Sequence, residues 1–387
     1  MKARAYTQLE KDLLRDLHQG VLRPGDLLPA ETALAQKYGI SRTSVRTAIA
    51  SLVEQGMLER RQGAGTFVAG GALSTHRALT ISLVVPDIND PFIAAIGSGI
   101  AGALGNQGTL LIQSSNGSSD TENANLEYIV QTRLDGAIVF PNWGVLNLEA
   151  LARLKLAGIP FVLVDRHFPG FAADSVTVDN FGGAFQATTH LVSLGHRRIA
   201  HLQGTDCSAN HDRRDGFLAA LAEADLPCYP HYLLKMDAAA DRKDAAWLAD
   251  RFEPDRQWGL RNTLRLMELP HPPTAIFAGN DFQALGAIEA LRQLGRRIPE
   301  EISVCGFDGL TLGRHFPIPL TTIAQPANRI GEEAMRLLLR RIRGDHADFP
   351  RQVVLDTTLV VRDSTAEPLT SPKLAHVAAT TTPLPGV

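Results

Sequence analysis

The sequence predicts an α/β protein in two parts: a small helical head that ends in a β-hairpin, and a larger body of two doubly wound lobes. Residues 1–68 hold short helical patterns, and residues 69–79 (AGGALSTHRAL) have the Gly, Ala and Ser content of a linker. Residues 80–363 alternate short apolar strands with helices, as in parallel βαβ units. Residues 364–387 are mostly Thr, Pro and Ala, and we expect them to form a disordered tail.

The composition is that of an ordinary globular protein. Its 387 residues are 44% hydrophobic and 20% charged, enough for two or three buried cores. The three cysteines form no C-x-x-C pair, so neither a disulfide framework nor a zinc ribbon is expected. The first twenty residues are charged throughout and no run of about 18 apolar residues follows, which predicts a cytoplasmic protein with no membrane partner.

Charge is unevenly distributed along the chain. The formal net charge of −3 by itself argues against nucleic-acid binding, which requires a basic surface. Residues 1–68, however, hold ten Lys and Arg against seven Asp and Glu. The head therefore carries +3 and the rest of the chain −6, which makes the head the candidate for contact with phosphates.

The head reads as three helices followed by a hairpin. Leu9, Leu13 and Leu17 share one helix face, and a Pro-Gly turn then precedes a second helix that starts near Pro29. Ser41 is a suitable N-cap for a third helix, and residues 62–65 (QGAG) separate two strand-like segments. This order predicts a winged helix-turn-helix.

The third helix exposes a polar face beside its buried stripe. A helix fits the major groove of duplex DNA, where side chains from its N-terminal end reach base edges. The alternative is that the face is merely solvated. The predicted DNA-contacting residues on this helix are Arg42, Thr43, Arg46 and Thr47.

The head resembles the GntR-type DNA-binding domain over nearly all of residues 6–68. The resemblance rests on G-x-L-x-P-G-x-x-L-P-x-E-x-x-L-A from Gly20, S-R-T-x-V-R-x-A from Ser41 and Q-G-x-G-T-F-V from Gln62. It implies that Arg42 and Arg46 contact bases and phosphates in the major groove and that Gln62 and Gly63 enter the minor groove from the wing. Ala30 and Thr32 depart from the family pattern, so its base preference cannot be transferred.

The body contains eight strand patterns with helical segments between them. In open parallel sheets, ligands bind in the crevice at the carboxyl ends of the strands, so the residues that follow each strand are candidates for a binding site. The strands are expected at Ile81–Val85, Thr109–Gln113, Gly136–Phe140, Pro160–Val164, Ile199–Gln203, His231–Lys235, Ala275–Ala278 and Ile302–Gly306.

Two motifs in the body do not point to a cofactor or a metal. Gly97–Gly102 (GSGIAG) matches the dinucleotide pattern G-x-G-x-x-G, but the glycines lie inside a helical pattern instead of directly after a strand, so we interpret them as permitting close helix packing. His190 and His196 are six residues apart, not four, and His196-Arg197 is typical of an exposed helix end. Neither a nucleophile elbow nor a P-loop occurs, and we expect no cofactor and no metal site.

Polar residues recur at the strand ends. Asp87–Phe92 follow the first strand, Asp165 and Arg166 the fourth, Asn280 the seventh and Asp308 the eighth. Carboxylates, amides and guanidinium groups that converge with an aromatic ring suit a ligand rich in hydroxyl groups. Any one of these residues could instead cap a helix, but their recurrence at one end of the sheets favours a binding site.

The body resembles the LacI/GalR-type effector domain, which is similar to periplasmic sugar-binding proteins. The resemblance spans residues 81–362 and rests on motifs such as P-F-V-L-V-D-R at 160–166, A-I-F-A-G-N-D at 275–281 and S-V-C-G-F-D at 303–308. It implies a ligand pocket between the lobes, with residues 238–269 left unassigned as a long, charged segment. The implied pocket residues are Asp90, Phe92, Arg213, Asn280, Asp308 and Gln325, with Asp165, Arg166 and Trp143 as weaker candidates.

The combination of head and body resembles the arabinose-repressor subgroup of bacterial regulators. It implies a homodimer that reads a paired operator in double-stranded DNA and a sugar or polyol effector that shifts its affinity for the operator. The resemblance implies no enzymatic activity. Two alternatives stay open: a pyridoxal-phosphate-dependent aminotransferase-like regulator, for which the few lysines of the body (Lys155, Lys235, Lys243) lack a suitable context, and a sugar-binding module without a regulatory role.

Overall fold

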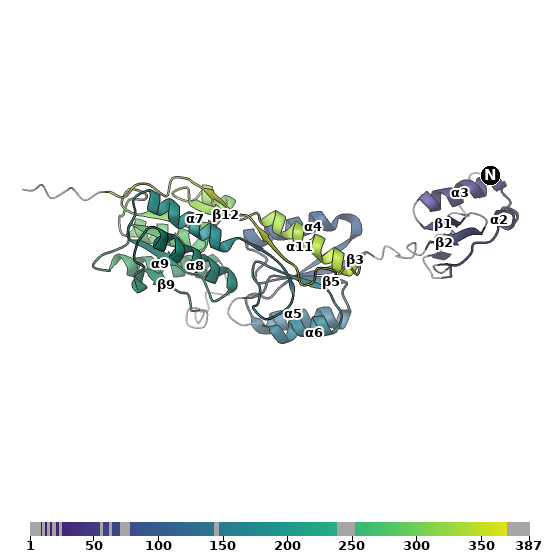
Figure 1. Cartoon of the computed structure of the whole chain (residues 1–387), viewed down its shortest axis with the longest axis horizontal. Coiled ribbons are helices and arrows are strands. Elements are labelled where there is room, and N and C mark those ends of the chain that lie inside the picture. Colours follow the sequence, from purple (N-terminus) through teal and green to yellow (C-terminus); the bar gives the residue numbers. More distant parts are fainter. Residues whose placement is uncertain are drawn as a thin grey trace, which may run out of the picture. The chain divides into compact units, whose positions relative to one another are not determined.

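The structure is a computed structural model of the whole chain. It describes residues 25–54, 57–61, 64–69, 78–142, 147–237 and 252–369, and seven residues between Leu9 and Leu22. Two compact units emerge, one of Met1–Leu79 with Asn106–Gly108 and one of Thr80–Gly105 with Thr109–Val387. We describe each unit by itself (Figure 1).

The head has the predicted winged helix-turn-helix order. Leu9, Leu13 and Leu17 are helical and buried, and they share a core with Val45 and Ile49. Ser41 caps the third helix, because its Oγ accepts a hydrogen bond of 3.1 Å from the Ser44 amide. The second helix begins two residues after the predicted Pro29. The elements are α2 (Glu31–Tyr38), α3 (Arg42–Glu54), β1 (Leu58–Arg61) and β2 (Gly65–Val68), the two strands being antiparallel.

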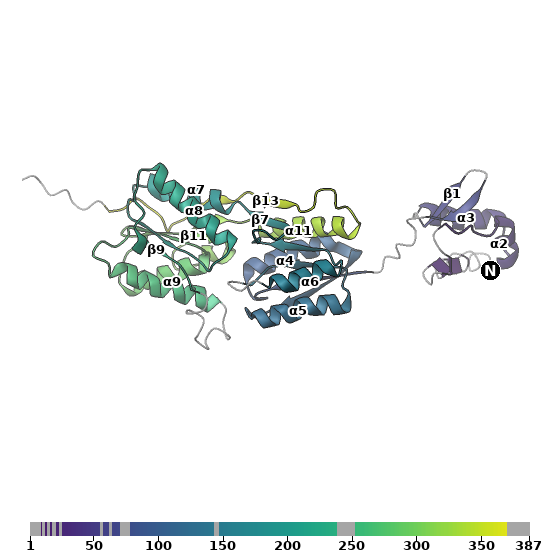
Figure 2. The same ribbon diagram turned by 60° about the horizontal axis from the view of Figure 1, so that its bottom comes forward.

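The first lobe of the body is a six-stranded sheet with helices on both faces. Its strand order is β13-β7-β6-β5-β3-β4. Helices α4 and α11 cover one face, and α5 and α6 cover the other (Figures 1 and 2). The strands are β3 (Leu79–Val85), β4 (Gly108–Ser114), β5 (Gly136–Val139), β6 (Phe161–Val164), β7 (Asp174–Val178) and β13 (Gln352–Leu355), and the helices are α4 (Pro91–Leu104), α5 (Ser119–Thr132), α6 (Leu148–Leu156) and α11 (Ala327–Ile342).

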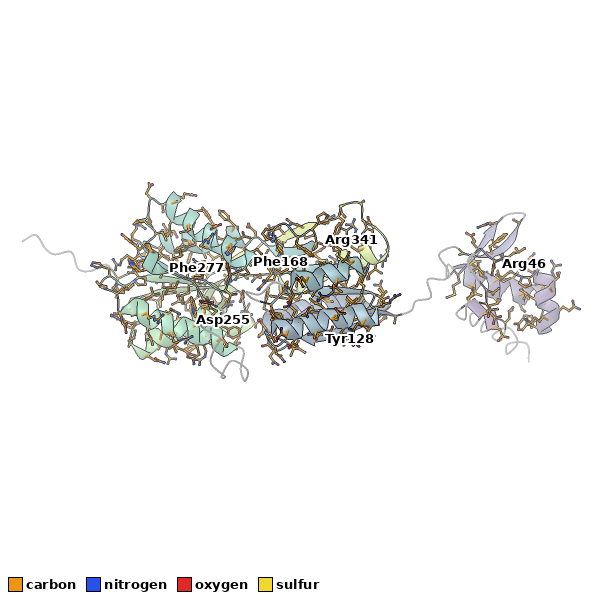
Figure 3. All side chains as sticks on the ribbon, turned by 90° about the horizontal axis from the view of Figure 1, so that it is seen from below. Arg46, Tyr128, Phe168, Asp255, Phe277 and Arg341 are labelled. Atoms are coloured by element: carbon orange, nitrogen blue, oxygen red, sulfur yellow. The ribbon has the colours of Figure 1, made fainter. Side chains whose placement is uncertain are left out.

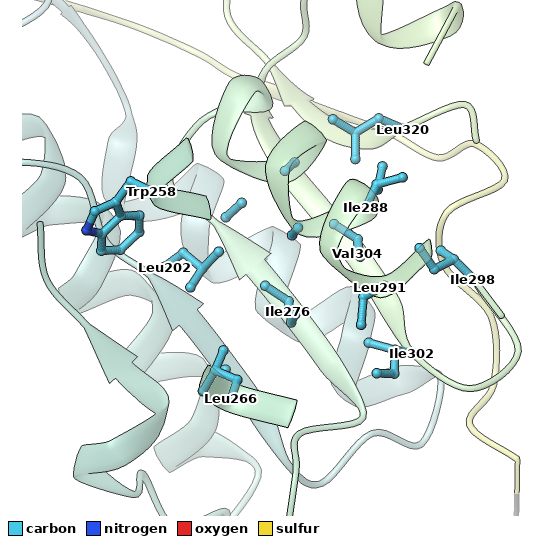
Figure 4. Packing of buried hydrophobic residues seen from close by; sticks show 14 of the residues in the cluster. Leu202, Trp258, Leu266, Ile276, Ile288, Leu291, Ile298, Ile302, Val304 and Leu320 are labelled. Atoms are coloured by element: carbon cyan, nitrogen blue, oxygen red, sulfur yellow. The ribbon is translucent and has the colours of Figure 1, made fainter. Parts of the chain in front are cut away.

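The second lobe repeats this design with strand order β14-β12-β11-β10-β8-β9. Its core between the sheet and α9 and α10 is apolar and includes Trp258, Ile276 and Ile288 (Figure 4). The edge strand β14 is antiparallel to β12. The strands are β8 (Ile199–Leu202), β9 (Leu233–Leu234), β10 (Ala275–Ala278), β11 (Ser303–Asp308), β12 (Thr321–Ala324) and β14 (Thr358–Val360), and the helices are α7 (Asn180–Ser193), α8 (Ser208–Glu223), α9 (Phe252–Met267) and α10 (Asp281–Gln293).

Three segments connect the two lobes. The chain leaves the first lobe after β7, returns between β12 and α11, and leaves again between β13 and β14. Gln325 and Pro326 form the second of these crossings. Each lobe is therefore built from distant parts of the sequence, and motion between the lobes must be absorbed by these three short segments.

All eight predicted body strands exist, although the one predicted at His231–Lys235 is reduced to β9. The sequence did not predict β7, β12, β13 and β14. Strand β7 (DSVTV) starts with a buried aspartate, Asp174, that apolar patterning cannot identify. Strand β13 (QVVL) has mostly exposed or half-buried side chains and so lacks the continuous burial of the central strands.

The glycines of Gly97–Gly102 lie inside α4, as predicted, and Gly99 among them permits close helix packing. A Cβ on Gly99 would lie 2.0 Å from the carbonyl oxygen of Asn328 in α11. Only glycine allows the two backbones to approach this closely. The interpretation as a packing feature, in place of a dinucleotide fingerprint, is confirmed.

Two sequence interpretations that involve the segment after β14 are wrong. The predicted disordered tail starts too early: Ser364 is fully buried, and its Oγ donates to the Val304 carbonyl and accepts from the Thr321 amide. His196 is not at an exposed helix end but is fully buried, where its ring bonds to Ser303 and to the carbonyl of Ala366. The segment after β14 covers this end of the second lobe, which local sequence patterns around His196 cannot reveal.

Candidate functional site

The polar face of α3 is exposed, as the sequence predicted. Arg42, Thr43, Arg46 and Thr47 all lie on the solvent side, whereas Val45 and Ile49 are buried. Ser41 begins the helix, so these four residues occupy its first two turns, the part of a recognition helix that reaches base edges. The arrangement gives the head one basic and hydroxyl-bearing surface that could meet a duplex.

Glu31 holds Arg46 in place, and sequence reasoning missed this contact. The Arg46 Nε lies 2.9 Å from a Glu31 carboxylate oxygen, and an Arg60 guanidinium nitrogen lies 3.9 Å from the other oxygen. Glu31 thus joins α2, α3 and the first strand of the wing. Arg46, labelled in Figure 3, remains 63% exposed at its side chain, so the contact orients it without burying it.

The wing consists of β1 and β2. Its Arg61 lies over the ring of Phe67, 4.6 Å from the ring centre, and bonds to Glu59. The predicted minor-groove residues Gln62 and Gly63 fall outside the described residues. The geometry of the wing tip is therefore left as a prediction.

A pocket lies between the two lobes of the body at the carboxyl ends of both sheets. It collects the predicted residues that follow β3, β6, β10 and β11, and it adds residues from the start of α8 and from α9. Its lining is Asp87, Asp90, Phe92, Phe140, Asp165, Arg166, Cys207, Ala209, Asn210, Arg213, Asp255, Asn280, Phe282 and Asp308.

Asp90 and Asn280 both cap helices and line the pocket. The Asp90 carboxylate accepts a 2.8 Å bond from the Phe92 amide at the start of α4, and the Asn280 side chain accepts a 2.8 Å bond from the Gln283 amide at the start of α10. The same side chain can therefore cap a helix and line the binding pocket. Capping fixes each side chain at the pocket wall before a ligand arrives.

Aromatic and basic groups form the first lobe's part of the wall. Phe92 and Phe140 meet edge to face with ring centres 6.4 Å apart. The Arg166 guanidinium lies 5.0 Å from the centre of the Phe140 ring and forms a buried ion pair of 2.7 Å with Asp165. The result is an apolar surface with a fixed charge pair beside it.

Arg213 is the main basic group of the second lobe's wall. It comes from α8 and is buried, its Nε donates to the Asn180 side chain at 2.8 Å, and another nitrogen donates to the Gly279 carbonyl at 2.6 Å. Its guanidinium lies 3.8 Å from the centre of the Phe307 ring. These contacts hold the guanidinium plane in one orientation, while no carboxylate among the described residues forms an ion pair with it.

Asp308 closes the second lobe's side of the pocket. Its φ of 126° is unusual for a residue other than glycine, and its carboxylate accepts a 2.8 Å bond from Gln325. Gln325 itself lies behind the lining, on a crossing segment. Burial raises the pKa of Asp308 well above its ordinary value and raises the pKa of Asp90 to about 6, and the proximity of Asp90 contributes to the shift of Asp308.

Trp143 lies outside the described residues, so its predicted place near the pocket is untested. The residue before it, Asn142, is buried and donates its amide to Glu122 at 3.1 Å. Asp255 and Phe282 are lining residues that sequence reasoning missed. Asp255, labelled in Figure 3, belongs to the charged segment 238–269 that could not be assigned and lies in the first turn of α9, and no sequence pattern distinguished it.

No group of His, Cys, Asp and Glu within the described part of the chain could hold a metal ion. Of the body lysines considered for a Schiff base, Lys155 bonds to the Ala172 carbonyl and Lys235 pairs with Asp206, both outside the pocket lining, and Lys243 is not among the described residues. In the same described ranges, no helix has the length and apolar character needed to cross a membrane.

Comparison with known proteins identifies both parts. The model of bacterial regulatory proteins of the gntR family matches residues 5–68, and the periplasmic binding protein-like domain matches residues 188–365. The arabinose metabolism transcriptional repressor of Geobacillus stearothermophilus is 30% identical over 371 residues, covering 94% of this chain and 98% of that protein. The chain belongs to this family of bacterial transcriptional repressors.

Three further similar proteins cover smaller shares of this chain. The HTH-type transcriptional repressor CytR of Escherichia coli (strain K12) is 32% identical over 298 residues, covering 76% of this chain and 82% of that protein. A structure of a transcriptional regulator CelR–cellobiose complex aligns with a TM-score of 0.64 at 26% identity, covering 87% of this chain and all of that one. A LacI family regulator from Enterococcus faecium with bound ribose aligns with a TM-score of 0.62 at 29% identity, covering 74% and 99%.

Proposed function

We propose that this repressor is a homodimer whose affinity for operator DNA is controlled by a sugar or polyol bound between its two lobes. The observation that supports the effector class is the pocket itself. Fixed carboxylate, amide and guanidinium groups stand beside the Phe92 and Phe140 rings, the combination that recognises hydroxyl groups and the C–H faces of a sugar. Sugar-bound relatives of the same fold support this choice.

The charge of the lining favours a neutral effector. Five aspartates and two arginines line the pocket, and Arg166 already pairs with Asp165. A phosphate group would have to enter beside Asp90, whose pKa of about 6 leaves it mostly ionised at pH 7, and this like charge repels the phosphate. The proposed ligand is therefore a sugar or polyol without phosphate, which the pocket binds and does not convert.

The proposed ligand residues follow from the lining and its direct supports. Asp90, Asn280 and Asp308 accept bonds from hydroxyl groups, and Arg213 donates to their oxygens. The aromatic rings bind the less polar face of the ring. Trp143 joins this set on the family resemblance alone. The complete proposed set is Asp90, Phe92, Trp143, Asp165, Arg166, Arg213, Asn280, Asp308 and Gln325.

On the DNA side, each head is proposed to place α3 in a major groove and its wing in the adjacent minor groove. Arg42, Thr43, Arg46 and Thr47 would meet bases and phosphates, and Gln62 and Gly63 would enter the minor groove. Since a single head carries only a small positive charge, two heads on paired half-sites are required for tight binding. The operator is in the bacterial cytoplasm, which is the proposed place of action.

Control of DNA binding requires that the effector bind one arrangement of the lobes more tightly than the other. A ligand that binds both arrangements equally does not change the equilibrium between them. Closure of the lobes around a sugar would bend the three crossing segments and move the dimer contacts. A coupling of about 1–3 kcal/mol between the effector and operator sites would give the release of DNA that a repressor needs.

The experiment is a thermal-shift screen of the full chain against neutral sugars, polyols and sugar phosphates, followed by calorimetry on the best ligand. The same ligand is then added to the protein bound to a fluorescent operator. Binding of a neutral sugar together with release of the operator supports the proposal. Selective binding of a sugar phosphate, or ligand binding that leaves operator affinity unchanged, contradicts it, and light scattering that shows a monomer contradicts the dimer.

A further inference from the structure

A second cavity lies at the opposite end of the first lobe. It has a volume of about 330 Å³ and is lined from the N-terminal ends of β6 and β7, from the end of α11 and from the loop that follows α11. The effector pocket, in contrast, lies at the carboxyl ends of the same sheet. The lining residues used below are Lys155, Ile159, Pro160, Phe161, Arg341 and Phe349.

The walls of this cavity are largely apolar. Ile159 and Phe161 belong to the buried core and face it from the start of β6, and Phe349 closes it from the loop after α11. Phe349 is 41% exposed although it is a large aromatic residue. Flat apolar walls of this kind suit a planar hydrocarbon or aromatic group, which they would remove from water.

The buried end of the cavity contains the guanidinium group of Arg341, whose charge is neutralised by two aspartates. Arg341 is almost fully buried and bonds to both oxygens of the Asp174 carboxylate, at 2.7 and 3.0 Å. It also bonds to the Asp348 carboxylate at 2.9 Å. Arg341, labelled in Figure 3, therefore keeps the end of α11 attached to β7 and adds little net attraction for an anion.

Lys155 is different, because its ammonium is held in place by contacts other than an ion pair with any of the described residues. Its Nζ donates to the Ala172 carbonyl at 2.9 Å and lies 5.7 and 5.4 Å from the ring centres of Phe171 and Phe349. Among the described residues, no carboxylate lies within ion-pair distance of this ammonium. A cation fixed against aromatic rings at the mouth of an apolar cavity is a suitable partner for a carboxylate on an apolar ligand.

We propose that this cavity is a second ligand site, separate from the effector pocket, that binds a small planar carboxylate. The hydrocarbon part lies between Pro160, Phe161 and Phe349, and the carboxylate pairs with the Lys155 ammonium. An ion pair beside apolar walls is less screened than one in open water, so the charge contributes to both affinity and orientation.

Cinnamate and its neutral analogue cinnamamide are the probes, and binding to the full chain is followed by calorimetry and saturation-transfer NMR. Cinnamate is expected to bind saturably and at least about tenfold more tightly than cinnamamide. Lys155→Met, which keeps the length of the side chain and removes its charge, is expected to weaken cinnamate binding by about tenfold or more. Phe349→Ala tests the apolar wall and is expected to weaken both probes.

Two matched variants locate the site. Lys235→Met removes another exposed lysine outside both cavities and should leave cinnamate binding unchanged, and Arg213→Ala should do the same because it alters only the effector pocket. Equal binding by the wild type and Lys155→Met, a loss of binding in Arg213→Ala alone, or no saturable binding up to about 10 mM would each overturn the proposal. Cooperative thermal unfolding of each variant confirms that it is folded.

Discussion

Gln325, on the segment that crosses between the lobes, donates a 2.8 Å hydrogen bond to Asp308 at the wall of the effector pocket. This single contact links the segment that must bend when the lobes move to a group that is proposed to touch the ligand. Gln325 is buried and Asp308 is half-buried, and Asp308 adopts a positive φ that the surrounding structure has to maintain. The bond therefore couples backbone geometry to the binding site.

Gln325→Leu should weaken effector binding by about tenfold, because it removes the donor that orients the buried Asp308 carboxylate. The side chain keeps a similar volume, so packing is largely preserved. Calorimetry with the effector measures the loss, and fluorescence anisotropy with an operator should show unchanged DNA affinity without ligand. Thr357→Val, on another crossing segment, is the control. Equal losses in both variants would indicate general damage to the crossings.

Arg213→Ala should produce a protein that binds operator but no longer responds to effector. The change removes a guanidinium that is aligned by Asn180 and Gly279 and stacked on Phe307. We expect at least about a hundredfold loss of effector affinity, as for other buried charged hydrogen-bonding groups. Arg214→Ala, next along α8, half-exposed and paired with Asp215, should behave as the wild type. If Arg213→Ala releases the operator at the same effector concentration as the wild type, Arg213 does not take part in effector binding.

Arg46→Ala should weaken operator binding by about 1–3 kcal/mol while effector affinity stays the same. Its matched control is Arg153→Ala, which also removes an exposed arginine paired with a glutamate, but on the first lobe of the body. Anisotropy titrations of operator binding at several salt concentrations distinguish a phosphate contact of Arg46 from a base contact. A shallower salt dependence indicates a phosphate contact, and an unchanged slope with relaxed sequence preference indicates a base contact. Unchanged operator affinity would contradict both.

Acid should destabilise the second lobe through His201. This residue is buried, its Nδ1 is bonded to the Phe277 carbonyl at 3.0 Å, and burial lowers its pKa from 6.5 to about 4. Because the unfolded chain takes up the proton at a higher pH than the folded one, stability is lost as the pH falls from about 6.5 toward 4. From pH 7 to pH 5 the expected loss is about 2 kcal/mol.

Urea unfolding of the wild type and of His201→Gln at both pH values measures this contribution. The comparison between the two proteins is needed because buried carboxyl groups act in the opposite direction. Burial raises the pKa of Asp281 to about 7, so acidification increases its contribution to stability. His201→Gln should show the smaller loss on acidification, and His315→Gln, at an exposed position, should follow the wild type. Identical pH dependence in all three proteins would show that His201 does not carry the effect.

Sequence reasoning succeeded where local patterns determine the outcome. The Ser41 cap, the exposed Arg42 and Arg46, and the helical placement of Gly99 all follow from a few neighbouring residues. The predicted strand ends also meet at one pocket, because parallel sheets place all their carboxyl ends on one edge. The strand ends already supplied Asn280 and Asp308 of the second lobe, and the resemblance to known families added Arg213 and Gln325, which follow no predicted strand.

What the sequence could not show depends on partners far along the chain. His196 is buried by Ala366, 170 residues later, and Arg46 is oriented by Glu31 from another helix. Asp255 reaches the pocket from a segment whose charge made it resemble a surface insertion. In each case the position of the residue depends on a tertiary contact, and the local hydrophobic periodicity of the sequence does not predict such contacts.

The three crossings between the lobes also set the order in which the protein can be completed during its synthesis. The first lobe lacks edge strand β13 and helix α11 until residues 327–355 have been made, and by then nearly all of the second lobe already exists. Neither lobe can complete its sheet as the ribosome first passes it. A nascent chain that ends before residue 352 would lack β13 and β14, so β7 and β12 would become edge strands, and early termination would affect both lobes at once.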